Sequence, residues 1–157
     1  MIRTRRRVNA KPPAKLSTRT SQNLVAVAFG TEERLPIHEL IINRRVPGRA
    51  LVRIRRLVGL TKDELAFALG LPSARSLSAH ERAGVRLAPA ISEHLYRIAR
   101  VADLTARVFG GRKAAYLWLR QPNLALAQWT PIALLSTEAG CGLVEQVVHS
   151  VEYGIYL

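Results

Sequence analysis

The sequence has a single cysteine, four dispersed histidines and no long run of apolar residues. Because Cys141 stands alone, no internal disulfide can form. No apolar stretch approaches the roughly 20 residues that cross a bilayer, and the opening MIRTRRRVNAKPPAK lacks the apolar segment of a signal peptide. We therefore expect a cytoplasmic protein with no membrane partner.

Acidic side chains are scarce in the C-terminal part, where three occur among the last 47 residues. No nucleophile and base stand at a suggestive spacing, and no glycine-rich phosphate loop follows a strand pattern. The histidines at positions 38, 80, 94 and 149 are too far apart to suggest a metal site. The sequence therefore predicts a protein that is not an enzyme, with no cofactor and no metal.

The net charge of +13 is concentrated at the N-terminal end. Residues 1–22 carry +7, residues 23–60 carry +4, residues 61–110 carry +2, and residues 111–157 are neutral. This gradient predicts a front half that neutralises nucleic-acid phosphates and a back half with another task. Residues 1–22 contain little that a core could bury, so we expect a disordered basic tail.

From about residue 35 the apolar spacing is helical, and residues 60–84, LTKDELAFALGLPSARSLSAHERAG, have the pattern of a helix-turn-helix. Thr61 and Glu64 form a T-x-x-E capping box, which predicts a helix start at this point. Gly70 supplies the permissive backbone at which that helix can end. Helix pairs with a glycine turn also occur in ordinary bundles, so the basic charge is needed to favour DNA binding.

The second helix of this pair is predicted to begin after Ser73, to run to about Arg82 and to bury Leu77. Its outward side chains then have the arrangement of a recognition helix, in which N-terminal residues meet base edges and basic groups hold phosphates. The predicted DNA contacts are Lys62, Ser73, Arg75, Ser76, Ser78 and Arg82.

The C-terminal part continues the helical pattern. One long helix is expected after Pro89, with a buried stripe from Leu95 to Ala106, and Gly110 and Gly111 stop it. Thr130 and then Thr137 have the features of helix caps. The final helix carries a valine stripe at Val144, Val147, Val148 and Val151.

Several motifs in the region from about residue 35 to 157 resemble those of the Xre/ParS-type antitoxins of RES-Xre toxin-antitoxin systems, which are of type II. The order and spacing of the C-terminal motifs carry most of this resemblance. The motifs are GLTKDELAFALGLPSARSL, R-L-x-P-x-x-S (Arg86–Ser92), VFG (Val108–Gly110), A-x-x-W-L-x-x-P-N (Ala115–Asn123), T-P-I-x-L-L-x-T-E-x-G (Thr130–Gly140) and V-E-Y-G-x-Y (Val151–Tyr156).

The resemblance implies an all-α antitoxin with a helix-turn-helix region and a small C-terminal helical module that binds a RES-domain toxin. Such toxins consume NAD, and the antitoxin occludes them and represses its own operon through operator DNA. A homodimer within a larger toxin-antitoxin complex is also implied. The expected division is a tail at 1–22, a DNA-binding and dimerising region at 23–100, and a toxin-binding domain at 101–157. The alternative is a stand-alone helix-turn-helix regulator whose C-terminal motif serves dimerisation.

Residues of the C-terminal motifs are the expected toxin contacts. Trp129 has two interpretations, a core residue or a partner contact. Ile155 and Leu157 either fold back onto the valine stripe or enter the toxin's active-site cleft, for which the uncharged end YGIYL (Tyr153–Leu157) offers rigid aromatic contact area. The predicted toxin contacts are Trp118, Asn123, Trp129, Glu152, Tyr153, Gly154, Ile155, Tyr156 and Leu157.

Overall fold

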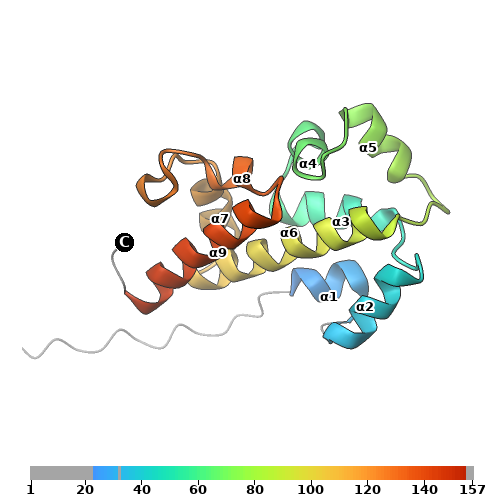
Figure 1. Ribbon diagram of the computed structural model, residues 1–157, viewed down its shortest axis with the longest axis horizontal. Coiled ribbons are helices and arrows are strands. Elements are labelled where there is room, and N and C mark those ends of the chain that lie inside the picture. The colour runs from blue at the N-terminus through green and yellow to red at the C-terminus, as the bar shows by residue number, and fades with distance from the viewer. Residues whose placement is uncertain (1–22, 32, 155–157) are drawn as a thin grey trace, which may run out of the picture.

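The computed structural model describes residues 23–31 and 33–154, and every regular element in these ranges is a helix (Figure 1). This confirms the predicted all-α class. The predicted tail at 1–22 lies outside the described residues. The elements are α1 (Leu24–Phe29), α2 (Arg34–Ile42), α3 (Arg49–Val58), α4 (Lys62–Ala68), α5 (Ala74–His80), α6 (Pro89–Val108), α7 (Arg112–Leu119), the 3-10 turn η1 (Leu124–Leu126), α8 (Pro131–Leu134) and α9 (Glu138–Tyr153).

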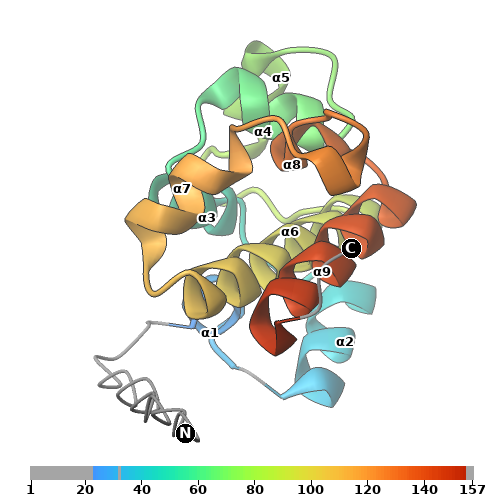
Figure 2. The ribbon, with the colours of Figure 1, turned by 90° about the vertical axis from the view of Figure 1, so that its left-hand side faces the viewer.

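Helix α6 is the central element of the fold. Its 20 residues start with Pro89, whose fixed φ suits a first helical turn, and the chain leaves the helix through Gly110 and Gly111, both at positive φ. Figure 2 shows α6 and α9 between α1 and α2 on one side and α4, α7 and α8 on the other. The predicted stripe from Leu95 to Ala106 is buried in this position, as expected.

Helices α6 and α9 lie side by side and run in the same direction (Figures 1 and 2). Each acid of the last 47 residues pairs with an arginine of α6, and the pairs follow one another in the same order along both helices. Surface ion pairs of this kind contribute little stability, at most about 1 kcal/mol each, but they mark the register of the two helices. The pairs are Arg97–Glu138 at 3.2 Å, Arg100–Glu145 at 3.1 Å and Arg107–Glu152 at 3.5 Å.

The valine stripe of α9 is buried at Val144, Val147 and Val148, whereas Val151 is 50% exposed. The stripe is therefore covered over its first three valines and open at its last.

The helix-turn-helix is formed by α4 and α5, as predicted. The Thr61 hydroxyl accepts from the Glu64 amide at 3.1 Å, and the Glu64 carboxylate accepts from the Thr61 amide at 2.7 Å, which completes the capping box. Ser73 caps α5 through the Ser76 amide, and Leu77 is fully buried. Helix α5 ends at His80, slightly before the predicted end at about Arg82.

Helix α1 is an element that the sequence analysis missed. Six residues are too few for a stable isolated helix. Asn23 caps the helix through the Val25 and Ala26 amides, and the carboxylate of Asp103, on α6, accepts from the amides of Leu24 at 2.7 Å and Val25 at 3.1 Å. A local and a distant side chain together therefore satisfy the first turn. Leu24 and Phe29 are buried in the common core.

The predicted division between residues 100 and 101 falls inside α6, which packs against α1, α2, α3, α7 and α9. The division therefore remains a proposal about function and marks no break in the chain. Within the described ranges, none of the helices has the length and apolar character that a membrane span requires.

Candidate functional site

The outward face of α5 carries two exposed arginines of the predicted DNA contacts. Arg75 lies in the first turn of the helix and Arg82 lies just beyond its end, and both are exposed. The Ser73 hydroxyl is already used to cap the helix. Ser76 is partly buried, and its carbonyl oxygen lies 2.8 Å from Nδ1 of His80. The arginines are therefore the side chains of α5 best placed to reach an external anion.

Lys62 and Ser78, two further predicted DNA contacts, are bonded to each other. The Lys62 ammonium donates to the Ser78 hydroxyl at 2.9 Å and lies 3.8 Å from the carboxylate of Glu81. Glu81 also accepts from Arg55 of α3 at 3.1 Å. Sequence reasoning missed Glu81, because its partners come from two other helices, α3 and α4. This network holds α5 against α3 and α4, and Glu81 neutralises part of the positive charge of Arg55 and Lys62.

Trp118 and Asn123, predicted toxin contacts, have structural roles in the C-terminal part. Trp118 is half-buried and stacks on Phe109, with ring centroids 5.0 Å apart. The Asn123 side chain accepts from the Ala125 amide at 2.9 Å, and its backbone bonds with Gln128 and Trp129. Asn123 therefore closes the loop that joins α7 to α8.

This loop presents two large apolar side chains to solvent. Leu124 is 84% exposed and Trp129 is 58% exposed, so the interpretation of Trp129 as a core residue was wrong. Ala127 and Gln128 both have positive φ, 51° and 67°, which costs a non-glycine residue about 1 kcal/mol. A closed, strained loop that exposes a tryptophan is typical of a contact surface.

The end of α9 combines an ion-paired carboxylate with an exposed tyrosine that stacks on the His149 ring. Glu152 is engaged with Arg107 and with the His149 ring at 3.1 Å, whereas Tyr153 is 72% exposed. Gly154 ends the helix with φ of 66°, a conformation that glycine adopts without strain. The remaining predicted contacts, Ile155, Tyr156 and Leu157, lie outside the described residues.

The helix-turn-helix and the C-terminal part are joined at Arg120, which follows α7. Its guanidinium donates to the Glu64 carboxylate at 2.8 Å and to the Gly59 carbonyl at 3.0 Å, and it lies 3.8 Å from the centroid of the Tyr116 ring. Partial burial alone would raise the pKa of Glu64. The hydrogen bonds from Thr61 and Arg120 and the charge of Arg120 outweigh this, so the pKa lies below its usual range.

Two family models match the chain and together span most of it. Residues 38–100 match the antitoxin Xre-like helix-turn-helix domain, and residues 105–154 match the antitoxin Xre/MbcA/ParS C-terminal toxin-binding domain. The chain belongs to the Xre/MbcA/ParS antitoxin family. The families matched are antitoxin families and not enzyme families.

One relative, matched over about two thirds of its own length, carries the same assignment, whereas another is a monooxygenase matched over a short segment. The chain is 35% identical over 98 residues to the antitoxin Xre of Yersinia enterocolitica serotype O:8 / biotype 1B, a match that covers 62% of this chain and spans 66% of that relative's length. It is 42% identical over 50 residues to 6-hydroxy-3-succinoylpyridine 3-monooxygenase HspA of Pseudomonas putida, which is 32% of this chain and 16% of that protein.

A solved structure of the M. tuberculosis MbcT-MbcA toxin-antitoxin complex contains a chain with the same fold. The TM-score is 0.54 at 24% identity, over 70% of this antitoxin and 96% of that chain. Together, these findings establish an Xre-type antitoxin with a helix-turn-helix and a toxin-binding domain.

Proposed function

We propose that this antitoxin binds and occludes a RES-type toxin that consumes NAD, and that it represses its own operon by binding operator DNA. The antitoxin itself performs no chemistry in this proposal and acts in the cytoplasm. The observation that carries the toxin half is the match of residues 105–154 to a toxin-binding domain whose surface exposes large apolar side chains.

These apolar side chains need a partner to cover them. Leu117 on α7, Leu124 and Trp129 on the following loop, and Tyr153 at the end of α9 are all at least half exposed. Tryptophan and tyrosine bury much area at little entropic cost, which makes them frequent hot spots of protein interfaces. We propose that the toxin docks on this part of the antitoxin and that residues 155–157 enter its active-site cleft.

The DNA half of the proposal is supported by the helix-turn-helix and the charge. Helix α5 follows α4 at a short turn, and its exposed Arg75 and Arg82 are the arginines proposed to reach the DNA. Helices of this kind enter the major groove, and paired half-sites match a two-fold dimer. We therefore propose that a homodimer, as part of the larger toxin-antitoxin complex, binds the operator.

The direct test is to co-express the antitoxin with the product of the adjacent reading frame. A tag on the antitoxin should retain that product, and NAD should fall in cells that express the product alone but not in cells that express both. A product that binds but leaves NAD unchanged would exclude a RES-type toxin. If the gene has no toxin gene beside it and its product still binds its own promoter, the alternative of a stand-alone regulator would be favoured.

A further inference from the structure

Two loops on either side of the helix-turn-helix pair to form a short ribbon. The Gly48 amide donates to the Val85 carbonyl at 2.9 Å, and the Leu87 amide donates to the Val46 carbonyl at 2.9 Å. A side chain at Gly48 would collide with the carbonyl oxygen of His80, so the ribbon lies directly against the end of α5. It therefore adjoins the helix proposed to enter the DNA groove.

The ribbon is flanked by four exposed arginines, which we name the ribbon arginines. Among the residues that the structure describes, none of them has an acidic partner. One of the four braces the ribbon, because the Arg86 guanidinium donates to the Arg45 carbonyl at 2.8 Å. The ribbon arginines are Arg44, Arg45, Arg49 and Arg86.

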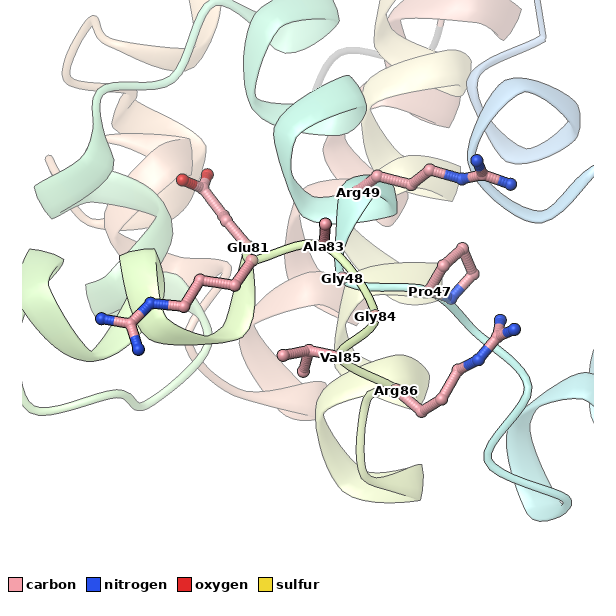
Figure 3. A pocket seen from close by; sticks show the side chains of 9 residues that line it. Pro47, Gly48, Arg49, Glu81, Ala83, Gly84, Val85 and Arg86 are labelled. Atoms are coloured by element: carbon pink, nitrogen blue, oxygen red, sulfur yellow. The ribbon is translucent and has the colours of Figure 1, made fainter.

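A pocket of about 320 Å³ opens between the two loops of the ribbon. Figure 3 shows the guanidinium groups of Arg49 and Arg86 on the same side of this pocket, near Pro47. Glu81 is the acid that lines the pocket, and it is already paired with Arg55 and Lys62. Uncompensated positive charge next to α5 therefore lies on the ribbon as well as at Arg82.

The backbone conformation of Arg44 supports a role for its side chain in binding another molecule. After α2 the Arg44 amide bonds to the Ile41 carbonyl and the Arg45 amide bonds to the Leu40 carbonyl, with Arg44 at a φ of 52°. Glycine is favoured at this position of a helix end, whereas a larger residue is strained. The Arg44 side chain makes no bond within the described residues that would offset this strain. Residues held in unfavourable backbone conformations are concentrated at functional sites.

We propose that the ribbon arginines bind backbone phosphates of DNA beside the segment contacted by α5. Guanidinium groups bind phosphate oxygens in a bidentate manner, and contacts to phosphates fix the position of a protein on the duplex without reading sequence. In this arrangement the ribbon sets how α5 lies in the groove, and the exposed arginines of α5 read or flank the bases. The inference rests on the proposed DNA-binding function and adds a site to it.

The test compares two full-length variants that each lose two positive charges. Arg44→Gly/Arg49→Gln removes charge from the ribbon, and Arg34→Gln/Lys113→Gln is a control that removes charge from exposed positions on α2 and α7. Each is titrated over a range of salt with a duplex of the antitoxin's own promoter and with a random-sequence duplex of equal length. The ribbon variant should flatten the dependence of log affinity on log salt by about 1.8 on both duplexes, since each phosphate contact contributes about 0.9. The control should match the wild type.

Thermal melting separates this result from loss of folding. Glycine at position 44 relieves backbone strain, so the ribbon variant should melt at the wild-type temperature or above it. A wild-type salt dependence in the ribbon variant would overturn the inference and leave the proposed DNA binding intact. If the wild type binds neither duplex, the DNA-binding proposal itself fails, and the site fails with it. If the ribbon variant binds the toxin more weakly and binds DNA as the wild type does, the ribbon is a protein contact, and the proposed phosphate site is overturned.

Discussion

The guanidinium of Arg120 lies 2.8 Å from the carboxylate of Glu64 and joins the end of α7 to the first turn of α4. The same carboxylate completes the capping box of the helix-turn-helix. On its other side, the Tyr116 ring packs against Gly59, where a larger residue would collide with it. The toxin-binding domain and the helix-turn-helix therefore share one set of contacts and are packed as a single unit.

Glu64→Gln should lower the free energy of unfolding at pH 7 by about 1 kcal/mol, because the hydrogen bond from Arg120 loses its negatively charged acceptor, while the glutamine oxygen can still accept from the Thr61 amide. The pKa of Glu64 is lowered in the folded state, so its contribution is full above the ordinary glutamate pKa of about 4.3 and is lost as the pH falls through the folded value. Urea denaturation at pH 7 and near pH 3 measures this. The wild type and variant should differ less at the lower pH.

The matched control for this prediction is Glu93→Gln, at an exposed position of α6 with no ion-pair partner among the described residues. It should change stability by less than about 0.5 kcal/mol at either pH. An equal effect of the two substitutions at pH 7 would show that the Glu64 contacts contribute nothing specific.

Gly140→Ala should lower the stability of the protein and Gly142→Ala should raise it, although the two positions are only two residues apart in α9. A methyl group at Gly140 would collide with the Leu134 carbonyl of α8, which should cost about 1 to 3 kcal/mol. Gly142 has open space and a helical backbone, so alanine should stabilise by about 0.5 to 1 kcal/mol. Thermal denaturation of the two variants measures the difference. Equal melting temperatures would contradict the close approach of α8 to α9.

Trp129→Ser should weaken toxin binding by at least tenfold and leave the melting temperature nearly unchanged. The side chain is 58% exposed, so its removal takes little from the core, while loss of a buried interface tryptophan typically costs about 2 kcal/mol or more. Leu35→Ser is the control, since Leu35 is 69% exposed on α2, outside the toxin-binding domain. Isothermal titration with the toxin should show wild-type affinity for this control. Equal losses in both variants would remove Trp129 from the proposed interface.

Deletion of residues 155–157 should leave folding and DNA binding nearly intact while the toxin regains its ability to consume NAD. The reason is the proposal that the uncharged C-terminal end occupies the toxin's cleft. NAD turnover by the toxin is measured with full-length or shortened antitoxin, and circular dichroism melting serves as the control. Full inhibition by the shortened form would refute this role. A melting temperature lowered by many degrees would instead favour the interpretation that these residues cover the valine stripe.

The sequence by itself determined the features that depend on neighbouring residues. The Thr61–Glu64 capping box and the caps at Ser73 and Thr137 are bonds between residues three apart, so the local sequence suffices to predict them. The buried stripe of α6 follows from helical periodicity in the same way. The resemblance in the C-terminal motifs likewise led to the correct family.

Only the tertiary structure decided the features that depend on contacts between distant segments. Helix α1 needs the carboxylate of Asp103, 79 residues from Leu24, to complete its first turn. The exposure of Trp129 follows from a closed loop that keeps its side chain away from the core, and no local periodicity encodes that. The ribbon arginines are brought together because the Val46–Gly48 and Val85–Leu87 segments pair across the helix-turn-helix. Hydrophobic burial and hydrogen bonding between such segments arise only when the whole chain has packed, and for that reason a local pattern does not reveal them.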